Sequence, residues 1–208
     1  MPPLKLKSLV HSDKKRKFVI IRHGETALNV QDNIRGWSDV PLNEHGHKQA
    51  EKLGRELRGR GIDMLIASDL TRTLQTANII SCESRIPIVA TTMALRPWNV
   101  GRYTGESGAK AHPILLEYAI EKPEENIPEG ESFESFKMRV LIGLISFLNQ
   151  YPDKLIAFVC HHRNDRLIRG WYEAGAPDDL EIDFEHFNQH GIEPGTADIL
   201  EISSPLIH

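Results

Sequence analysis

Two basic residues of different kinds, Arg22 and His23, directly follow the apolar run Phe18–Ile21 and precede Gly24. Aromatic and β-branched residues in an unbroken apolar run are typical of a buried strand, so we expect the pair at the C-terminal end of that strand. In open α/β sheets, ligands bind at this edge. An imidazole beside a guanidinium, with a glycine that leaves room for a ligand, indicates a nucleophile or a base poised against an anion.

Two later segments place polar side chains in the same way. Arg72 follows the run Met64–Ala67 and is expected in the first turn of a helix, near the positive end of its dipole. His161 and His162 follow the run Leu155–Cys160, and the register of the strand favours His161 as the residue that enters the pocket. Parallel strands bring their C-terminal ends to one edge. Because guanidinium groups match phosphate oxygens and hold the charge that develops during phosphoryl transfer, the sequence predicts a phosphate pocket there.

The elements that position these residues predict an α/β fold with a mostly parallel central sheet and helices on both faces. The strand-like runs are Phe18–Ile21, Met64–Ala67, Ile86–Ala90, Leu155–Cys160 and Ala197–Ile202. Apolar periodicity predicts helices from the N-cap Asn43 to about Gly59, from Asp69 to Ile80, from Ser132 to Gln150 and from Asn164 to Ala174.

We expect one domain over residues 1–208, because 208 residues suffice for one well-formed core and no linker divides the chain. Residues 1–16 are expected to be an N-terminal lead-in. Prolines and glycines are concentrated between Thr91 and Pro128. This stretch, about 91–128, therefore predicts an irregular lobe or lid over the edge of the sheet.

The composition narrows the class of protein. A formal net charge of −4 gives no basic footprint for nucleic acid or for a membrane surface. We find no signal peptide and no apolar run long enough to span a bilayer, and two cysteines fit a reducing compartment. His45 and His47 point in different directions on a helix, so they predict no metal site. The expectation is a soluble, cytoplasmic protein, and the sequence leaves its oligomeric state open.

These motifs, in this order, resemble the histidine phosphatase superfamily, the phosphoglycerate mutase-like proteins. The resemblance runs from Phe18 to about Trp171, most of the chain. It is carried by Arg22-His23-Gly24-Glu25-Thr26, Asn29, Gly36, Asp39-Val40-Pro41-Leu42, Gly46, Gln49-Ala50, Ser68, Arg72, Gln75-Thr76-Ala77, Gly101, Thr104-Gly105, Gly130-Glu131-Ser132 and His161. It implies a phosphoglycerate mutase-like fold.

The resemblance also implies catalytic roles. His23 is the expected nucleophile, which attacks phosphorus to form a phosphohistidine that water then hydrolyses. Arg22, Arg72 and His161 are expected to bind the phosphoryl oxygens and to stabilise their developing charge. The arginines favour the neutral, nucleophilic form of His23 by like-charge repulsion. No metal and no cofactor is implied.

Further substrate contacts are expected from Asn29, Arg35, Gly24 and His162. Asn29 and Arg35 lie on the segment that lines the pocket in the family. His162 stands where the family usually has glycine, so it is expected to narrow the pocket. The family usually has arginine at Asn33 and a small polar residue or glutamine at Arg35. The positive charge has thus moved by two positions, and the substrate contacts are expected to differ.

The proton donor of the family is missing at its usual place. In the family, a Leu-Arg-Glu-like element after the third strand supplies a carboxylic acid, and alignment of Leu95–Gly101 puts Pro97 there. Glu106 is the nearest carboxyl group in the sequence and is the candidate substitute acid. General acid catalysis contributes ~10²–10⁴-fold, so its loss slows substrates with alkoxide leaving groups most.

The sequence as a whole predicts a metal-independent phosphatase. Its expected substrate is a small phosphomonoester or a phosphorylated protein side chain. Two alternatives stay open. Phosphoglycerate mutase-type transfer requires a phosphoenzyme that outlasts product exchange. The second alternative, suggested by Pro97 at the position of the acid, is a catalytically weakened protein that binds phosphate or a phosphopeptide.

Overall fold

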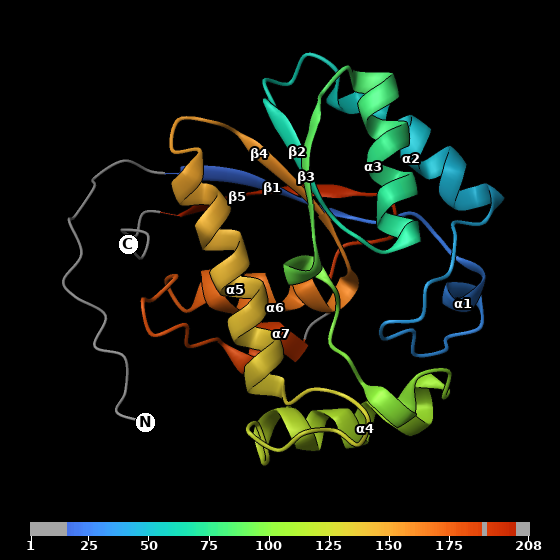
Figure 1. Ribbon diagram of the computed structural model, residues 1–208, viewed down its shortest axis with the longest axis vertical. Coiled ribbons are helices and arrows are strands. Elements are labelled where there is room, and N and C mark those ends of the chain that lie inside the picture. Colours follow the sequence, from blue (N-terminus) through green and yellow to red (C-terminus); the bar gives the residue numbers. More distant parts are fainter. Residues whose placement is uncertain (1–15, 189–190, 203–208) are drawn as a thin grey trace.

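A computed structural model describes residues 16–188 and 191–202 as a central sheet between helical layers (Figure 1). The strands are β1 (Arg16–Arg22), β2 (Met64–Ser68), β3 (Ile88–Thr92), β4 (Ile156–Cys160) and β5 (Ala197–Ile202). Their order is β3-β2-β4-β1-β5, with parallel pairing throughout except that β5 runs antiparallel to β1. The expected α/β fold with a mostly parallel sheet is confirmed.

Period-two alternation along the strands divides the core into two layers. On β1, Phe18 and Ile20 face one layer, while Val19 and Ile21 face the other. The helices are α1 (Ala27–Val30), α2 (Glu44–Leu57), α3 (Thr71–Ser84), α4 (Gly108–Ile120), α5 (Phe133–Gln150), α6 (His162–Glu173) and α7 (Phe184–Asn188). Helices α5 and α6 supply the first layer, and α2 and α3 supply the second. The sheet is therefore covered on both faces, as expected for its buried, apolar strands.

Helix boundaries differ from the sequence prediction by a few residues. Helix α3 begins at Thr71 and α6 at His162, two residues from the expected starts in each case. Arg16 already belongs to β1, so the expected lead-in over 1–16 is one residue too long, and residues 1–15 lie outside the described part. No helix among the described residues has both the length and the apolar character needed to cross a membrane.

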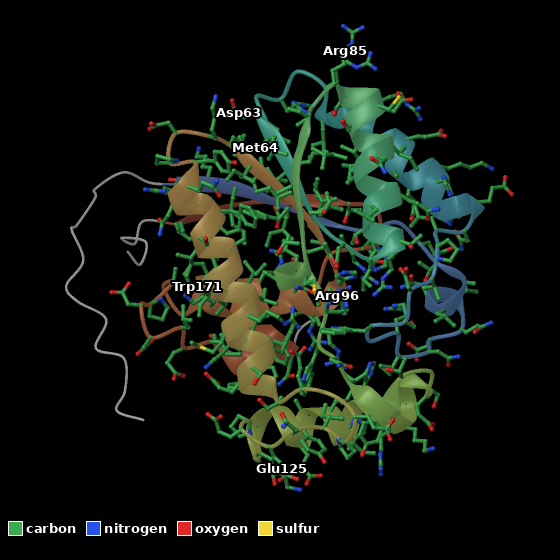
Figure 2. All side chains as sticks on the ribbon, viewed as in Figure 1. Asp63, Met64, Arg85, Arg96, Glu125 and Trp171 are labelled. Atoms are coloured by element: carbon green, nitrogen blue, oxygen red, sulfur yellow. The ribbon has the colours of Figure 1, made fainter. Side chains whose placement is uncertain are left out.

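The stretch 91–128 is less irregular than its proline and glycine content predicts. It contains α4, a regular helix with Pro113 inside it. Ala111, Leu115 and Ala119 are buried at a spacing of four residues along this helix. Burial of this stripe outweighs the hydrogen bond that the proline removes. Side chains of α4 and of the preceding segment lie below the sheet edge in Figure 2, with Arg96 between the sheet and the lobe and Glu125 at its far end.

The first turn of α2 packs against the backbone that leaves β1. A Cβ atom on Gly24 would lie 2.5 Å from the carbonyl oxygen of Gly46, and one on Gly46 would lie 2.2 Å from that of Glu25. Asn43 caps this turn, because its Oδ1 accepts from Gly46 N at 2.8 Å while its Nδ2 donates to Glu25 Oε1 at 2.7 Å. The contact fixes the chain directly after His23.

We predict that Asn43→Ala lowers the free energy of unfolding by about 1 kcal/mol, because the Gly46 amide loses its acceptor. Asn43→Ser keeps an oxygen for that amide and should retain most of the stability. Urea denaturation followed by circular dichroism measures both variants. Equal midpoints for Asn43→Ala and wild type would show that the cap contributes nothing.

Candidate active site

The C-terminal ends of β1, β2 and β4 meet at one edge of the sheet. These strands are neighbours, and Arg22 lies opposite Cys160 in the register of β1 and β4. His23 N donates to the Cys160 carbonyl at 3.1 Å. The rings of His23 and His161 consequently lie with their centroids 5.2 Å apart. The structure thus brings together the two histidines that follow separate strands.

His23 is a buried, neutral imidazole with one nitrogen available for reaction. Its side chain is 1% exposed, and its Nδ1 lies 2.7 Å from the Gly24 carbonyl oxygen. A carbonyl only accepts, so Nδ1 carries the proton and Nε2 carries the lone pair. Burial, and next the charge of Arg72, hold the pKa of His23 well below its usual 6.5. This tautomer is the one that a nucleophile at Nε2 requires.

His161 is oriented by two polar groups. Arg72 Nε donates to His161 Nδ1 at 3.2 Å, so Nε2 carries the proton and donates to Ser68 Oγ at 2.9 Å. Two further nitrogens of Arg72 donate to the carbonyls of Ser38, at 2.7 Å, and Gly36, at 3.2 Å. Burial, followed by the charge of Arg35, lowers the Arg72 pKa to about 9. Arg72 lies in the first turn of α3, as the sequence predicts.

A small cavity of about 70 Å³ lies at this edge. We call it the inner cavity; His23, Arg72 and His161 line it. A larger pocket of about 730 Å³, the outer pocket, shares six of its lining residues with the inner cavity. The shared residues are Ile34, Arg35, His112, His162, Arg163 and Arg166. A bound molecule can therefore extend from the inner cavity into the outer pocket.

The other predicted substrate contacts divide between these spaces. Arg35 and His162 line both, whereas Arg22 and Asn29 line the outer pocket. Arg22 donates through Nη1 to the Ile192 carbonyl at 2.8 Å and to His162 Nδ1 at 3.1 Å. Its Nε is buried without a hydrogen-bond partner among the described residues. Burial, and next the charge of Arg35, lowers the Arg22 pKa to about 10. Burial, and next the charge of Arg22, lowers the His162 pKa to about 3.

Two predicted site residues line neither space. Gly24 donates its amide to Thr76 Oγ1 at 3.1 Å and packs on Gly46. Its missing side chain makes room for a helix and not for a ligand. Glu106 forms an ion pair with Lys110 at 2.8 Å on the lobe. Proximity in sequence thus did not bring its carboxyl group to the cavity.

Pro97 lies where the family supplies a carboxylic acid, and it lines the inner cavity. Its carbonyl accepts from Trp37 Nε1 at 2.8 Å and from Arg139 Nη2 at 3.2 Å. No carboxylate is among the residues that line the inner cavity, and Asp32 is the one carboxylate lining the outer pocket in the described part of the chain. The cavity that His23 and Pro97 line together is therefore without a carboxylic acid in the described part of the chain.

Sequence reasoning missed three of the basic residues that line both spaces: His112, Arg163 and Arg166. His112 comes from α4, in the stretch expected to be irregular. Arg163 and Arg166 share a face of α6, three residues apart. A predicted start at His162 instead of Asn164 would have placed both arginines at the beginning of the helix that follows β4.

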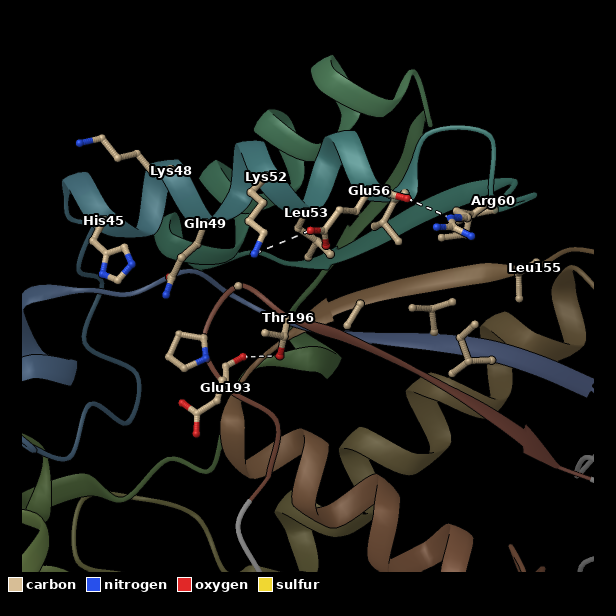
Figure 3. A pocket seen from close by; sticks show the side chains of 17 residues that line it. His45, Lys48, Gln49, Lys52, Leu53, Glu56, Arg60, Leu155, Glu193 and Thr196 are labelled. Atoms are coloured by element: carbon tan, nitrogen blue, oxygen red, sulfur yellow. Dashed lines mark hydrogen bonds and ion pairs between the residues drawn. The ribbon is translucent and has the colours of Figure 1, made fainter.

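A larger cavity lies elsewhere, between α2 and β5 (Figure 3). Its volume is about 1020 Å³. Its lining includes His45, Gln49, Lys52 and Thr196, and none of the arginines and histidines that line the inner cavity or the outer pocket. No group of three or more metal-ligating side chains occurs among residues 16–188 and 191–202. The chemistry of the side chains, and not cavity size, places the candidate site at the strand edge.

We predict that His23 titrates well below pH 6.5 in the free protein. Burial and the charge of Arg72 both disfavour the imidazolium. Arg72→Gln removes one of these causes, so it should move the titration midpoint of His23 upward. Histidine-selective NMR titration measures both midpoints, with His23→Asn to assign the signal. A wild-type midpoint at or above 6.5 would contradict the neutral form.

Comparison with known proteins matches this geometry to one family. The model of the histidine phosphatase superfamily (branch 1) matches residues 18–200. The uncharacterized phosphatase PhoE of Bacillus subtilis is 30% identical over 68% of this chain and 69% of its own length. The probable phosphoglycerate mutase GpmB of Klebsiella pneumoniae is 34% identical, and the match spans 62% of this chain and 61% of that protein.

Solved structures share the fold. Bacillus stearothermophilus YhfR has a TM-score of 0.74 at 24% identity, over 92% of this chain and 94% of that one. The mycobacterial glucosyl-3-phosphoglycerate phosphatase has a TM-score of 0.69 at 23% identity, over 88% and 92% of the two chains. The match of the family model over residues 18–200, together with the identity to PhoE, shows that the chain belongs to the histidine phosphatase superfamily.

Proposed function

We propose that this protein is a metal-independent phosphatase that forms a phosphohistidine on His23. The observation that carries the proposal is a buried, neutral imidazole whose Nε2 is free, in a cavity lined by guanidinium groups and by no carboxylate. Guanidinium groups supply the positive charge that a phosphoryl group needs. Named phosphatases and phosphoglycerate mutase-like proteins among its relatives support a phosphatase or a mutase-like enzyme.

In the proposed reaction, His23 Nε2 attacks phosphorus in line while the bond to the leaving oxygen breaks. Arg72 lines the inner cavity, and Arg22 lines the adjoining outer pocket with an Nε that has no partner among the described residues. These two arginines hold the phosphoryl oxygens as their charge grows. His161, whose Nε2 proton is donated to Ser68 Oγ in the free protein, becomes a further donor when a phosphoryl oxygen replaces that hydroxyl as its acceptor. Water then attacks the phosphohistidine, inorganic phosphate leaves, and neutral His23 is restored. The substrate is a small phosphate ester or a phosphorylated side chain.

A phosphoglycerate mutase activity and a phosphate-binding role are the alternatives. The names of several relatives favour the first. Pro97 at the cavity wall disfavours it, because a mutase must protonate an alkoxide in each cycle. The same residue favours the second, in which phosphate binds without turnover. Turnover of an aryl phosphate, measured beside phosphate binding, separates an enzyme from a binding protein.

We predict that His23→Ala lowers kcat/KM for 4-nitrophenyl phosphate by about 10³-fold or more, because the nucleophile is lost. His45→Ala is the matched control, since this histidine on α2 is exposed and outside the site. A chelator should leave the wild-type rate unchanged. Activity that a chelator abolishes, or that His23→Ala retains, would refute the mechanism.

We predict a strong dependence on the leaving group. Without an acid at Pro97, kcat/KM for 4-nitrophenyl phosphate should exceed that for glycerol phosphate by about 10²–10⁴-fold. Glu106→Gln should leave both values unchanged, since this carboxyl group pairs with Lys110 outside the cavity. A selective fall with the alkyl ester in Glu106→Gln would instead identify Glu106 as the acid.

A further inference from the structure

Three arginines line both the inner cavity and the outer pocket: Arg35, Arg163 and Arg166. Each has limited neutral contacts within the described residues. Arg35 reaches the Asn33 carbonyl at 3.5 Å, Arg163 stacks over the ring of Trp98 at 5.5 Å, and Arg166 donates to the Phe187 carbonyl. None of the three forms an ion pair with a carboxylate in the described part of the chain.

Two arginines outside the site, Arg96 and Arg169, pair with carboxylates. Arg96 makes a bidentate pair with Asp69, with both contacts at 2.8 Å. Arg169 bridges two aspartates, also at 2.8 Å. Asp32 and Asp165 lie near enough to Arg35 and Arg166 to raise the pKa of each, yet burial outweighs them and both pKa values are lowered. The site arginines are therefore short of negative charge, which is costly for partly buried cations unless a ligand supplies it.

One phosphoryl group does not supply enough charge. A phosphate monoester carries about −1.5 to −2 at neutral pH, and Arg22 and Arg72 match that charge. The charges of Arg35, Arg163 and Arg166 then remain without a matching anion. A single carboxylate offers one charge on two oxygens to three guanidinium groups. A second phosphate offers at least one charge while it is bridged, and nearly two charges on three acceptor oxygens once it departs. The electrostatics favour a second phosphate in the outer pocket.

Arg35 indicates that the two phosphates are adjacent. It lines both the inner cavity and the outer pocket. Its charge contributes to lowering the pKa values of His23 and Arg72, and also those of His162 and Arg163. A guanidinium group at this junction neutralises both phosphates only if they lie side by side. Phosphates joined through one bridging oxygen satisfy this condition.

The missing acid points the same way. Pro97 offers no proton to a departing oxygen. A departing phosphate, with its second pKa near 6, leaves as an anion and needs no proton, in contrast to an alkoxide. Guanidinium groups stabilise that anion directly.

We propose that the substrate is a phosphoanhydride, with its terminal phosphoryl group in the inner cavity and its next phosphate held as the leaving group by Arg35, Arg163 and Arg166. The inference rests on the proposed function. The bond between His23 Nε2 and the terminal phosphorus forms as the bridging P–O bond breaks, and the electron pair stays on the departing phosphate. Water oxygen then bonds to phosphorus, the N–P bond breaks, and the two water protons are shared between the released phosphate and solvent.

The first test compares substrates in the wild-type protein. Inorganic pyrophosphate and ADP are the phosphoanhydrides, AMP is the matched alkyl monoester, 4-nitrophenyl phosphate is the aryl reference, and fructose 1,6-bisphosphate carries two separated phosphates. We expect kcat/KM for pyrophosphate and ADP to exceed that for AMP and for the sugar bisphosphate by at least ~10²-fold. This comparison needs no variant, so a folding defect cannot obscure it.

The second test assigns the leaving-group site. Arg163→Gln and Arg166→Gln should each reduce kcat/KM for ADP by about 10- to 100-fold, as for a lost charge-assisted hydrogen bond. The fold-reduction of kcat/KM for ADP should be at least ten times the fold-reduction for 4-nitrophenyl phosphate. Arg166→Lys should recover part of it by restoring the charge. Arg102→Gln removes an exposed charge on the lobe and serves as the matched control.

The outcomes are distinguishable. Hydrolysis of 4-nitrophenyl phosphate with ADP no better than AMP, or with the sugar bisphosphate preferred, would overturn the phosphoanhydride inference and leave the proposed function standing. Equal losses with ADP and with the aryl ester in both arginine variants would also overturn it. Absence of hydrolysis with every substrate would refute the proposed function itself.

Discussion

Positive charge that has no carboxylate partner within residues 16–188 and 191–202 is the constraint on which this site depends. Arg72 and Arg35 lie close enough to His23 and His161 to lower the pKa of both imidazoles, in addition to burial. The same charges that keep His23 neutral would attract the phosphate that we propose it attacks. Such cations are costly to bury. The apolar layers on both faces of the sheet supply the stability that offsets this cost. In the proposed function, a bound phosphate completes the charge balance.

The topology of the sheet makes this concentration of charge attainable. Neighbouring parallel strands β1, β2 and β4 deliver their last residues to one edge, and the next helices begin there. The edge is held from two sides. Gly46 at the start of α2 packs on the chain after β1, and Gly195, just before β5, donates its amide to the carbonyls of Arg22 and His23 at 3.1 Å each. The segment that leads into the C-terminal strand thus helps to position His23.

Much of this arrangement could be predicted from local sequence signals, because the strands are short apolar runs and Asn43 is a strong cap. Convergence of the residues at the ends of β1, β2 and β4 followed from the rule for parallel strands. The errors share a physical cause, namely contacts between residues distant in sequence. Gly24 is fixed by Gly46 and not by a ligand, and Glu106 is near the site in sequence but pairs on the lobe. Helix α4, despite Pro113, is stabilised by burial that local propensity does not reveal.

The central claim is that His23 becomes covalently phosphorylated. Rapid acid-free quenching of the protein with a ³²P-labelled substrate, followed by proteolysis and mass spectrometry, tests it most directly. The account predicts a label that is stable in alkali, labile in acid and located on Nε2 of His23, and that is absent from His23→Ala. A label on any other residue of the wild-type protein, or phosphate release with no labelled intermediate under conditions that slow hydrolysis, would contradict it.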